Sequence, residues 1–379
     1  MYSFHKNNQP PSPLLRSSIS LLPPELLCEI FSFRASRGPL GLRHALFVCK
    51  YWHNLIVNDQ KLWSTIILDR DFVDQFKLRG VSGQISKANA YIGACLDRSA
   101  PFPLDITLFE NVNGVLVDAS ILSRLLCSGE PYHIQRCRSL SWYIENELYE
   151  NHTVSLPLPS SLERLEYLFV RGFTLHSDPS DRFPQCPRLK EVHLVNHLEG
   201  TLPHYFLDHD YTHVEKLTYT SDIRWIDYDI PYIQNFHGIH TLVLEDPFSV
   251  TLRYTILGDV ENTAIAHLHS LETLKLIGLV PLKIMQRLYV PNLKRIDIAT
   301  GSSAPHVHSL DKVPLPLLQS VVRIFICLSD SSTPPEPHHL RRIICGAPSL
   351  ACLTGTSGIG ELLAGEEWFK ERNIVYNCI

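Results

Sequence analysis

Apolar residues recur through most of this 379-residue chain in a fixed pattern with a nearly constant period. Each unit has an apolar residue at a first position and again three and five residues later. A unit with one short strand cannot bury its apolar face alone, so neighbouring units must stack and pair their strands. The pattern therefore predicts a solenoid with one parallel sheet. Its eight units are Cys137/Leu140/Trp142, Leu162/Leu165/Tyr167, Leu189/Val192/Leu194, Val214/Leu217/Tyr219, Ile239/Leu242/Leu244, Leu271/Leu274/Leu276, Leu293/Ile296/Ile298 and Val321/Ile324/Ile326.

The starts of these units are 25, 27, 25, 25, 32, 22 and 28 residues apart, and this repeat resembles that of leucine-rich-repeat proteins. The asparagine or cysteine that usually follows the strand is mostly missing, which predicts an irregular array with some convex segments as helices and others as loops. Leu350 and Leu353 would form a ninth, degenerate unit. The end of the chain, Gly360 to Ile379, is expected to form a helix through Trp368 and Phe369 and to cover the open end of the solenoid.

Side chains alternate between the two faces of a strand, so the inward leucines predict outward columns on the other face. We expect this concave face to recognise a protein, although a solvated sheet face would need polar residues in any case. Aromatic residues in the longer inserts, Tyr205, Phe206, Trp225 and Tyr228, are more simply read as packing under loops than as interface anchors. The candidate substrate-face residues are Arg164, Glu166, Glu191, His193, Lys216, Thr218, Lys275, Arg295 and Asp297.

The segment from Leu22 to Trp63 predicts a compact helical unit with more apolar surface than it can bury alone. Pro23 and Pro24 fit the start of a helix, because a first-turn proline loses no helical hydrogen bond. Glu25 is favoured in that first turn by the helix dipole. Gly38-Pro39 interrupts the helix, and two further short helical segments follow. The apolar stripe of the first helix comprises Leu22, Leu26, Leu27, Ile30 and Phe31.

This segment resembles an F-box, the helical module by which a substrate receptor docks onto the Skp-type adaptor of a cullin–RING ubiquitin ligase. A later run, Ala94 to Leu108, resembles the segment after the box in F-box-like families expanded in mushroom-forming fungi. The resemblance implies three helices and an adaptor-docking face formed or supported by Leu22, Pro23, Leu26, Leu27, Ile30, Val48, Cys49 and Trp52. The matching residues are Leu22, Pro23, Glu25, Leu26, Leu27, Ile30, Phe31, Val48, Cys49, Trp52, Leu62 and Trp63.

Composition limits the classes of function. The formal charge of −5 gives no electrostatic reason to expect nucleic-acid binding, and no apolar run approaches the length of a membrane span. Ten cysteines without a C-x-x-C pair predict reduced, mostly buried thiols in a cytoplasmic or nuclear protein. Cys28 and Cys49 are expected to be small core residues.

No set of side chains predicts catalysis. The spacing resembles that of a metal site at His306, His308 and Asp311. Because the chain has 19 histidines, chance proximity explains this spacing better. The glycine-rich run 355–360 lacks the lysine of a phosphate loop and is expected to be a turn before the terminal helix. We therefore expect no enzyme activity, no cofactor and no metal.

Together these patterns predict an α/β chain in which a three-helix F-box precedes an irregular leucine-rich-repeat-like solenoid with a parallel sheet. The expected parts are a disordered tail (1–17), the box (18–63), a linking region with short strands and helices (64–135) and the solenoid with its cap (136–379). The expected function is substrate recognition for a cullin–RING ligase, with a Skp-type adaptor, a cullin and an unknown protein substrate as partners. The alternative is a leucine-rich-repeat scaffold outside any ligase.

Overall fold

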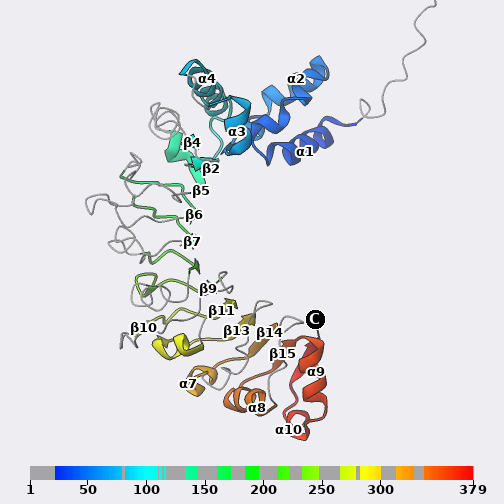
Figure 1. Ribbon diagram of the computed structural model, residues 1–379, viewed down its shortest axis with the longest axis vertical. Helices are drawn as coiled ribbons and strands as arrows, with labels where there is room; N and C mark the ends of the chain where they lie inside the picture. The colour runs from blue at the N-terminus through cyan, green and yellow to red at the C-terminus, as the bar shows by residue number, and fades with distance from the viewer. Residues whose placement is uncertain are drawn as a thin grey trace, which may run out of the picture.

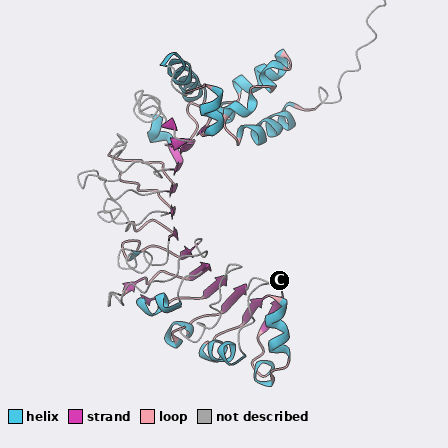
Figure 2. Ribbon diagram, in the orientation of Figure 1, coloured by secondary structure: helices cyan, strands magenta, loops and turns pink. Residues whose placement is uncertain are grey.

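The computed structural model describes residues 22–78, 82–109, 111–112, 115–116, 133–143, 160–171, 184–195, 211–221, 233–246, 265–278, 282–299, 313–327 and 337–378. Figure 1 shows these residues as an arc, with the helical N-terminal part at one end and the C-terminal helices at the other. The strands of a long sheet line the inner side of the arc, which we call the concave face. The described helices between the C-terminal strands lie on the outer side, as Figure 2 shows by secondary structure.

The N-terminal part begins with helix α1, in which Pro24 takes the first helical position. Gly38 has a φ of 83°, a left-handed conformation that favours glycine, and the chain turns there. Sequence analysis predicted three helices, but the segment after Gly38 forms short 3₁₀ turns. Gly41 of this segment lies close to α1, where a Cβ would overlap the carbonyl oxygen of Arg34. The elements are α1 (Pro24–Ala35), η2 (Pro39–Leu42), η3 (Ala45–Phe47), α2 (Lys50–Asn58) and η4 (Gln60–Trp63).

Among the described residues, twelve strands form one sheet in which every neighbouring pair is parallel. This sheet is consistent with the predicted repeat solenoid. Its order is β1 (Thr65–Leu68), β2 (Leu104–Phe109), β5 (Cys137–Tyr143), β6 (Tyr167–Arg171), β7 (Glu191–Val195), β8 (Lys216–Thr220), β9 (Thr241–Asp246), β11 (Thr273–Gly278), β13 (Arg295–Ala299), β14 (Arg323–Cys327), β15 (Cys352–Gly355) and β16 (Val375–Cys378).

The sheet begins earlier than the predicted solenoid. β1 follows η4 directly, and β2 pairs with both β1 and β5. The helices α3 (Arg70–Gln75) and α4 (Ser82–Arg98) connect β1 to β2. The predicted strands near residues 64–68 and 105–109 are therefore the first two strands of the array. Two small sheets stand apart, β3 (Asn111–Val112) with β4 (Val115–Leu116), and β10 (Ala266–His267) with β12 (Leu288–Tyr289).

A repeated backbone turn prepares each strand. The first apolar residue of a unit donates its amide hydrogen to the carbonyl of the residue three positions earlier, as Val214 does to Tyr211 at 3.1 Å. The next residue exposes a carbonyl that accepts two amide hydrogens from the following unit, as Lys190 does from Glu215 and Lys216. These bonds satisfy backbone groups that stacking would otherwise bury without partners. The three apolar positions of the units supply much of the core.

One predicted unit is out of register. Leu168 pairs with Val192 and Val170 with Leu194, so the second unit is Leu165/Leu168/Val170 and not Leu162/Leu165/Tyr167. Leu162 occupies the preceding turn, where its carbonyl accepts from the amide of Leu165. Because a shift by an odd number of residues moves a side chain to the other face, this correction changes which residues face the concave side.

The C-terminal units carry helices on their outer side, which agrees with the expected irregularity of the crossings. Leu350 and Leu353 do form a ninth unit around β15. The expectation that the glycine-rich run 355–360 is a turn was largely wrong, because Gly355 ends β15 and residues 357–360 already form the first turn of α9. The segment predicted as a cap supplies two helices and β16, which extends the sheet. The remaining elements are η5 (His133–Arg136), η7 (Leu282–Arg287), α7 (Leu315–Leu318), α8 (Pro337–Gly346), α9 (Ser357–Ala364) and α10 (Glu367–Lys370).

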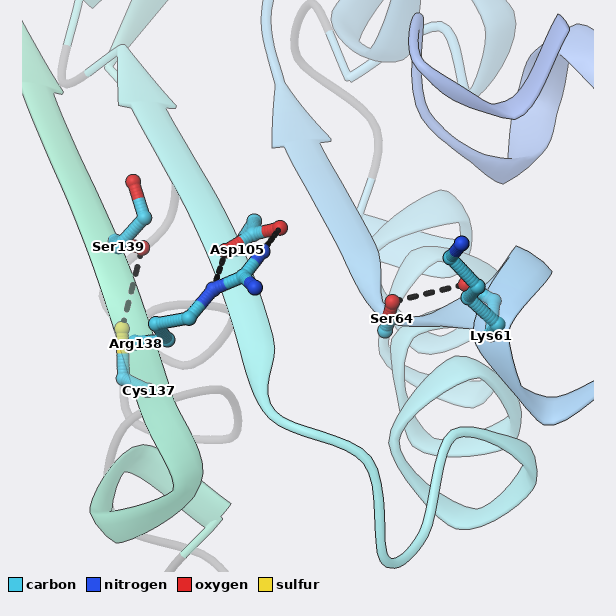
Figure 3. A network of polar contacts seen from close by, with 6 residues as sticks. All are labelled: Lys61, Ser64, Asp105, Cys137, Arg138 and Ser139. Carbon is cyan, nitrogen blue, oxygen red and sulfur yellow. Dashed lines mark hydrogen bonds and ion pairs between the residues drawn. The ribbon is translucent and has the colours of Figure 1, made fainter. Parts of the chain in front are cut away.

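The helical part and the sheet are joined through several polar contacts (Figure 3). The Ser64 hydroxyl donates to the Lys61 carbonyl at 2.8 Å, and the Ser64 carbonyl accepts the amide hydrogen of Asp105 at 2.9 Å. Arg138 of β5 reaches the Asp105 carboxylate of β2, with its Nη2 2.7 Å from Oδ2. The box therefore continues into the sheet by backbone hydrogen bonds and has no flexible linker at η4–β1.

Candidate functional site

Helix α1 has two apolar sides with different environments. Leu27, Phe31 and Ala35 are buried in the core. Leu26 is 46% exposed, Ile30 44% and Phe33 76%, and the spacing of four and three residues places them along one side of the helix. Helix α1 therefore presents an apolar stripe that the other described residues leave exposed to solvent.

The next elements extend this surface. Phe47 of η3 is 82% exposed, Val48 58% and Tyr51 of α2 45%, and α2 packs against both η3 and α1. Of the twelve large apolar side chains that are exposed among the described residues, six lie on α1, η3 and α2 or, for Val48, directly after η3. Such a concentration marks an interaction surface. We call it the docking face: Leu26, Ile30, Phe33, Phe47, Val48 and Tyr51.

A rigid core holds the docking face from beneath. The Trp52 ring meets the Phe31 ring edge-on, with centroids 5.2 Å apart. The buried Trp63 indole donates its Nε1 hydrogen to the Ile56 carbonyl at 2.9 Å, and the Arg98 guanidinium lies 4.4 Å from the centroid of that indole. These contacts fix α1, α2 and α4 around Trp63, so the exposed side chains lie on an ordered scaffold.

The predicted docking residues separate into exposed and supporting positions. Leu26, Ile30 and Val48 belong to the docking face, and Pro23 is exposed beside it. Leu22 and Trp52 are half-buried, whereas Leu27 is fully buried and can act only as support. The expectation that Cys49 is a small core residue was wrong, because Cys49 is exposed; Cys28 is half-buried, and burial and Asp59 raise the pKa of its thiol.

Sequence analysis missed three members of the docking face, Phe33, Phe47 and Tyr51. Phe33 follows Ile30 by three residues, so helical spacing could have found it. Phe47 ends a 3₁₀ turn and Tyr51 follows it, and across such a turn the α-helical period does not predict which side chains are exposed.

The concave face carries a row of rings from four neighbouring strands. Phe109 of β2 stacks on Tyr143 of β5 with centroids 4.2 Å apart and planes 4° from parallel. Tyr143 contacts Phe169 of β6 at 4.8 Å, and Phe169 meets the His193 ring of β7 edge-on at 4.8 Å. All four side chains are half-buried. We call Phe109, Tyr143, Phe169 and His193 the aromatic ladder.

A polar chain continues from the end of the ladder. His193 Nε2 lies 3.2 Å from the Thr220 hydroxyl, and that hydroxyl donates to the Glu245 carboxylate at 3.1 Å. Since the hydroxyl gives its hydrogen to Glu245, it accepts from His193, which places a hydrogen on Nε2. Burial lowers the pKa of His193. The nearby Glu245 carboxylate opposes this shift only in part, so the net direction is downward.

Farther along the same face, two cations hold one carboxylate and a third cation lies on the next strand. Arg295 Nε donates to Asp297 Oδ1 at 2.7 Å, and Lys275 Nζ lies 3.7 Å from Asp297 Oδ2. Arg323 is exposed and pairs in register with Arg295 on the neighbouring strand. Lys275 and Arg295 share the single charge of Asp297 and Arg323 adds a further positive charge, so these four residues together carry a net positive charge. We call Lys275, Arg295 and Arg323 the basic cluster.

The predicted substrate-face residues are partly corrected. Arg164 and Glu166 precede β6 and do not lie in the concave columns, because the second unit was read in the wrong register. Thr218 and Asp297 lie in the columns but are 9% and 7% exposed, so neither offers much surface. The remaining predicted residues are half-exposed members of the columns: Glu191, which pairs with Lys216, then His193, Lys216, Lys275 and Arg295.

The rings Phe109, Tyr143 and Phe169 were missed as members of this face. Tyr143 and Phe169 follow the inward residues of their strands and could have been found once the register was right. Phe109 lies on β2, which sequence analysis left outside the array. Tyr205, Phe206, Trp225 and Tyr228 lie outside the described residues, as do His306, His308 and Asp311.

Within the described ranges, no group of three histidine, cysteine or acidic side chains is close enough to hold a metal ion. No described helix is both long and apolar enough to cross a membrane. Among the described residues, the docking face and the concave face are the two surfaces with a chemistry that suits binding.

Comparison with known protein families gives a match in the N-terminal part of the chain. Among curated proteins, none matches this chain significantly. Residues 19–69 match the F-box-like family of domains, a range that contains the whole docking face. The match supports an F-box protein and, with it, a general adaptor role in ubiquitin ligation.

Proposed function

We propose that this chain is a substrate receptor of a cullin–RING ubiquitin ligase that binds a Skp-type adaptor, and through it a cullin, with the docking face of its N-terminal box. The observation that carries the proposal is the separation of adjacent residues on α1: Leu27 and Phe31 are buried, whereas Leu26 and Ile30 are exposed. The box has a complete core without Leu26 and Ile30, so these side chains are available to a partner. F-box domains in general bind adaptors of this kind, and the matched range supports the assignment.

The energetics favour a partner. Completing the burial of a half-exposed leucine or isoleucine removes about half of its apolar surface from water, worth about 1 kcal/mol. The six side chains of the docking face together supply a substantial part of the free energy that association requires, because the scaffold beneath them is already ordered and little further entropy is lost. An aromatic residue at each end, Phe33 and Phe47, fits the usual anchors of a protein interface.

The first test is co-expression of the full-length chain with a Skp-type adaptor, followed by affinity purification and size-exclusion chromatography. The wild-type chain should elute with the adaptor in a stoichiometric complex. The Leu26→Asp, Ile30→Asp variant should elute alone and remain folded by circular dichroism, because both positions are exposed in the free chain. A folded wild-type chain that forms no complex would contradict the proposal.

A matched control separates loss of the face from added charge. Ser86 and Ala90 are exposed on α4 with the same four-residue spacing. The Ser86→Asp, Ala90→Asp variant adds the same two charges to a helix outside the docking face, and it should bind the adaptor like the wild type. If both variants lose the adaptor, the effect is one of net charge and gives no support to the docking face.

In this account the concave face binds the substrate, and ubiquitin transfer is performed by other subunits of the ligase. The direct joint between η4 and β1 supports this arrangement, because a box fixed to the sheet would hold a bound substrate in a defined position relative to the adaptor. The second candidate function is an interaction scaffold outside a ligase. In that function the concave face is still a binding surface, but the folded chain does not bind the adaptor.

A further inference from the structure

The concave face has two chemically different ends that the proposed function does not by itself explain. The aromatic ladder occupies β2, β5, β6 and β7, and the basic cluster occupies β11, β13 and β14. A merely solvated face would need polar residues throughout, yet four half-exposed rings lie at one end. The two ends together point to a partner with an apolar part and an acidic part.

The ring geometry decides which apolar chemistry fits the ladder. Phe109 and Tyr143 are already stacked face to face, and Phe169 meets His193 edge-on, so most ring faces are occupied within the ladder. A nucleic-acid base needs a free ring face on which to stack. Aliphatic and aromatic side chains can instead pack against ring edges. The ladder therefore suits a protein side chain better than a base.

The balance of charges indicates which chemical group the basic cluster would bind. Asp297 is 7% exposed and is held by Arg295 and Lys275, so its negative charge is already compensated by these two cations. Arg323 is exposed beside Arg295, and two neighbouring guanidinium groups repel each other unless an anion lies between them. Guanidinium groups bind carboxylates and phosphates in bidentate fashion. An acidic side chain of the partner fits this position.

The strand spacing sets the separation between the two ends. The ladder ends with His193 on β7, and Arg295 of the basic cluster lies on β13, four strand spacings away in the sheet. At about 4.8 Å per spacing this is about 19 Å, and the inward curvature of the face shortens the path. An extended peptide advances about 3.3 Å per residue, so about five or six residues would connect the two ends.

We propose that the concave face binds an extended peptide segment of the substrate, laid across the strands, with an apolar anchor on the aromatic ladder and an acidic side chain on the basic cluster about five or six residues away. This proposal rests on the proposed function and specifies its substrate chemistry. The acidic group is an aspartate, a glutamate or a phosphorylated residue, which share the anionic contact with Arg295 and Arg323.

Selection from a phage-displayed library of random dodecapeptides on the purified full-length chain tests the proposal. Enriched sequences should carry an aromatic or aliphatic residue separated by about five or six positions from aspartate or glutamate. A selected peptide should then be synthesised with its acidic residue intact, replaced by phosphoserine, or replaced by alanine. The alanine form should bind at least roughly tenfold more weakly, and the phosphoserine form shows which anion is preferred.

Two variants locate the contacts. Arg323→Glu should weaken the selected peptide roughly tenfold or more, whereas Arg188→Glu, the same reversal on an exposed turn before β7, should leave its affinity unchanged. Phe169→Ala should weaken the apolar contact, with thermal unfolding measured alongside. No enriched sequences, enrichment without acidic residues, or equal effects of Arg323→Glu and Arg188→Glu would overturn the proposal. Adaptor binding in the same preparations reports separately on the proposed function.

Discussion

Replacing two adjacent leucines of α1 should have opposite consequences for folding and for adaptor binding. Leu27 is fully buried, so Leu27→Ala removes apolar contacts and leaves a cavity, which costs about 2–5 kcal/mol in comparable cores. Leu26 is 46% exposed, so Leu26→Ala loses about half of a leucine's transfer energy, roughly 1 kcal/mol or less. The better helix propensity of alanine offsets part of that loss.

Urea unfolding of the full-length chain, followed by tryptophan fluorescence, measures both effects, because Trp52 and Trp63 lie within the box. We expect a clearly lower midpoint for Leu27→Ala and a midpoint near that of the wild type for Leu26→Ala. Adaptor binding at temperatures where both variants are folded should show the reverse order, with Leu26→Ala the weaker binder. Equal destabilisation by the two changes would refute the two-sided description of α1.

Three further predictions concern the scaffold. Gly238→Ala should strongly destabilise the array, since a Cβ would overlap the Thr212 carbonyl, and a thermal midpoint equal to wild type would contradict this. Trp63→Phe removes the buried hydrogen bond to the Ile56 carbonyl and should lower the unfolding free energy by about 1–3 kcal/mol, measured in urea; a loss confined to the sheet would contradict it. Burial lowers the pKa of His193, so folding favours its neutral form. The resulting contribution to the free energy of unfolding is full above pH 6.5 and is lost as the pH falls toward the lowered pKa. His193→Gln should therefore flatten the pH dependence of the thermal midpoint below pH 6.5.

The periodic part of the fold could be predicted from the sequence because each unit repeats the same burial. The exception shows the limit of spacing alone: both Leu162/Leu165/Tyr167 and Leu165/Leu168/Val170 satisfy the pattern. The structure resolves the ambiguity through the preceding turn, which places a further apolar residue three positions before every unit. Tyr211, Phe236 and Leu268 occupy this turn position in later units.

The first two strands were recognised as strands but not as parts of the array, because β1 and β2 are separated by the helices α3 and α4. No regular period spans such an insertion. Their membership depends on long-range pairing with β5, which local sequence patterns do not record.

The docking face shows a similar limit. An apolar pattern identifies which residues of α1 avoid water, but the helix is apolar on two sides. Only packing against α2 and η4 decides that Leu27 and Phe31 are buried and that Leu26 and Ile30 are exposed. The ladder likewise requires the corrected register of β6, which carries Phe169, and the assignment of β2 to the array, which adds Phe109.

Calorimetric titration of the full-length chain with a purified Skp-type adaptor tests the central claim most directly. The account predicts one adaptor per chain and a negative heat-capacity change from burial of the apolar docking face. Ile30→Asp should abolish the heat of binding, and the Ser86→Asp, Ala90→Asp control should preserve it. Binding that is unaffected by Ile30→Asp, or no binding by the folded wild-type chain, would contradict the claim that this face receives the adaptor.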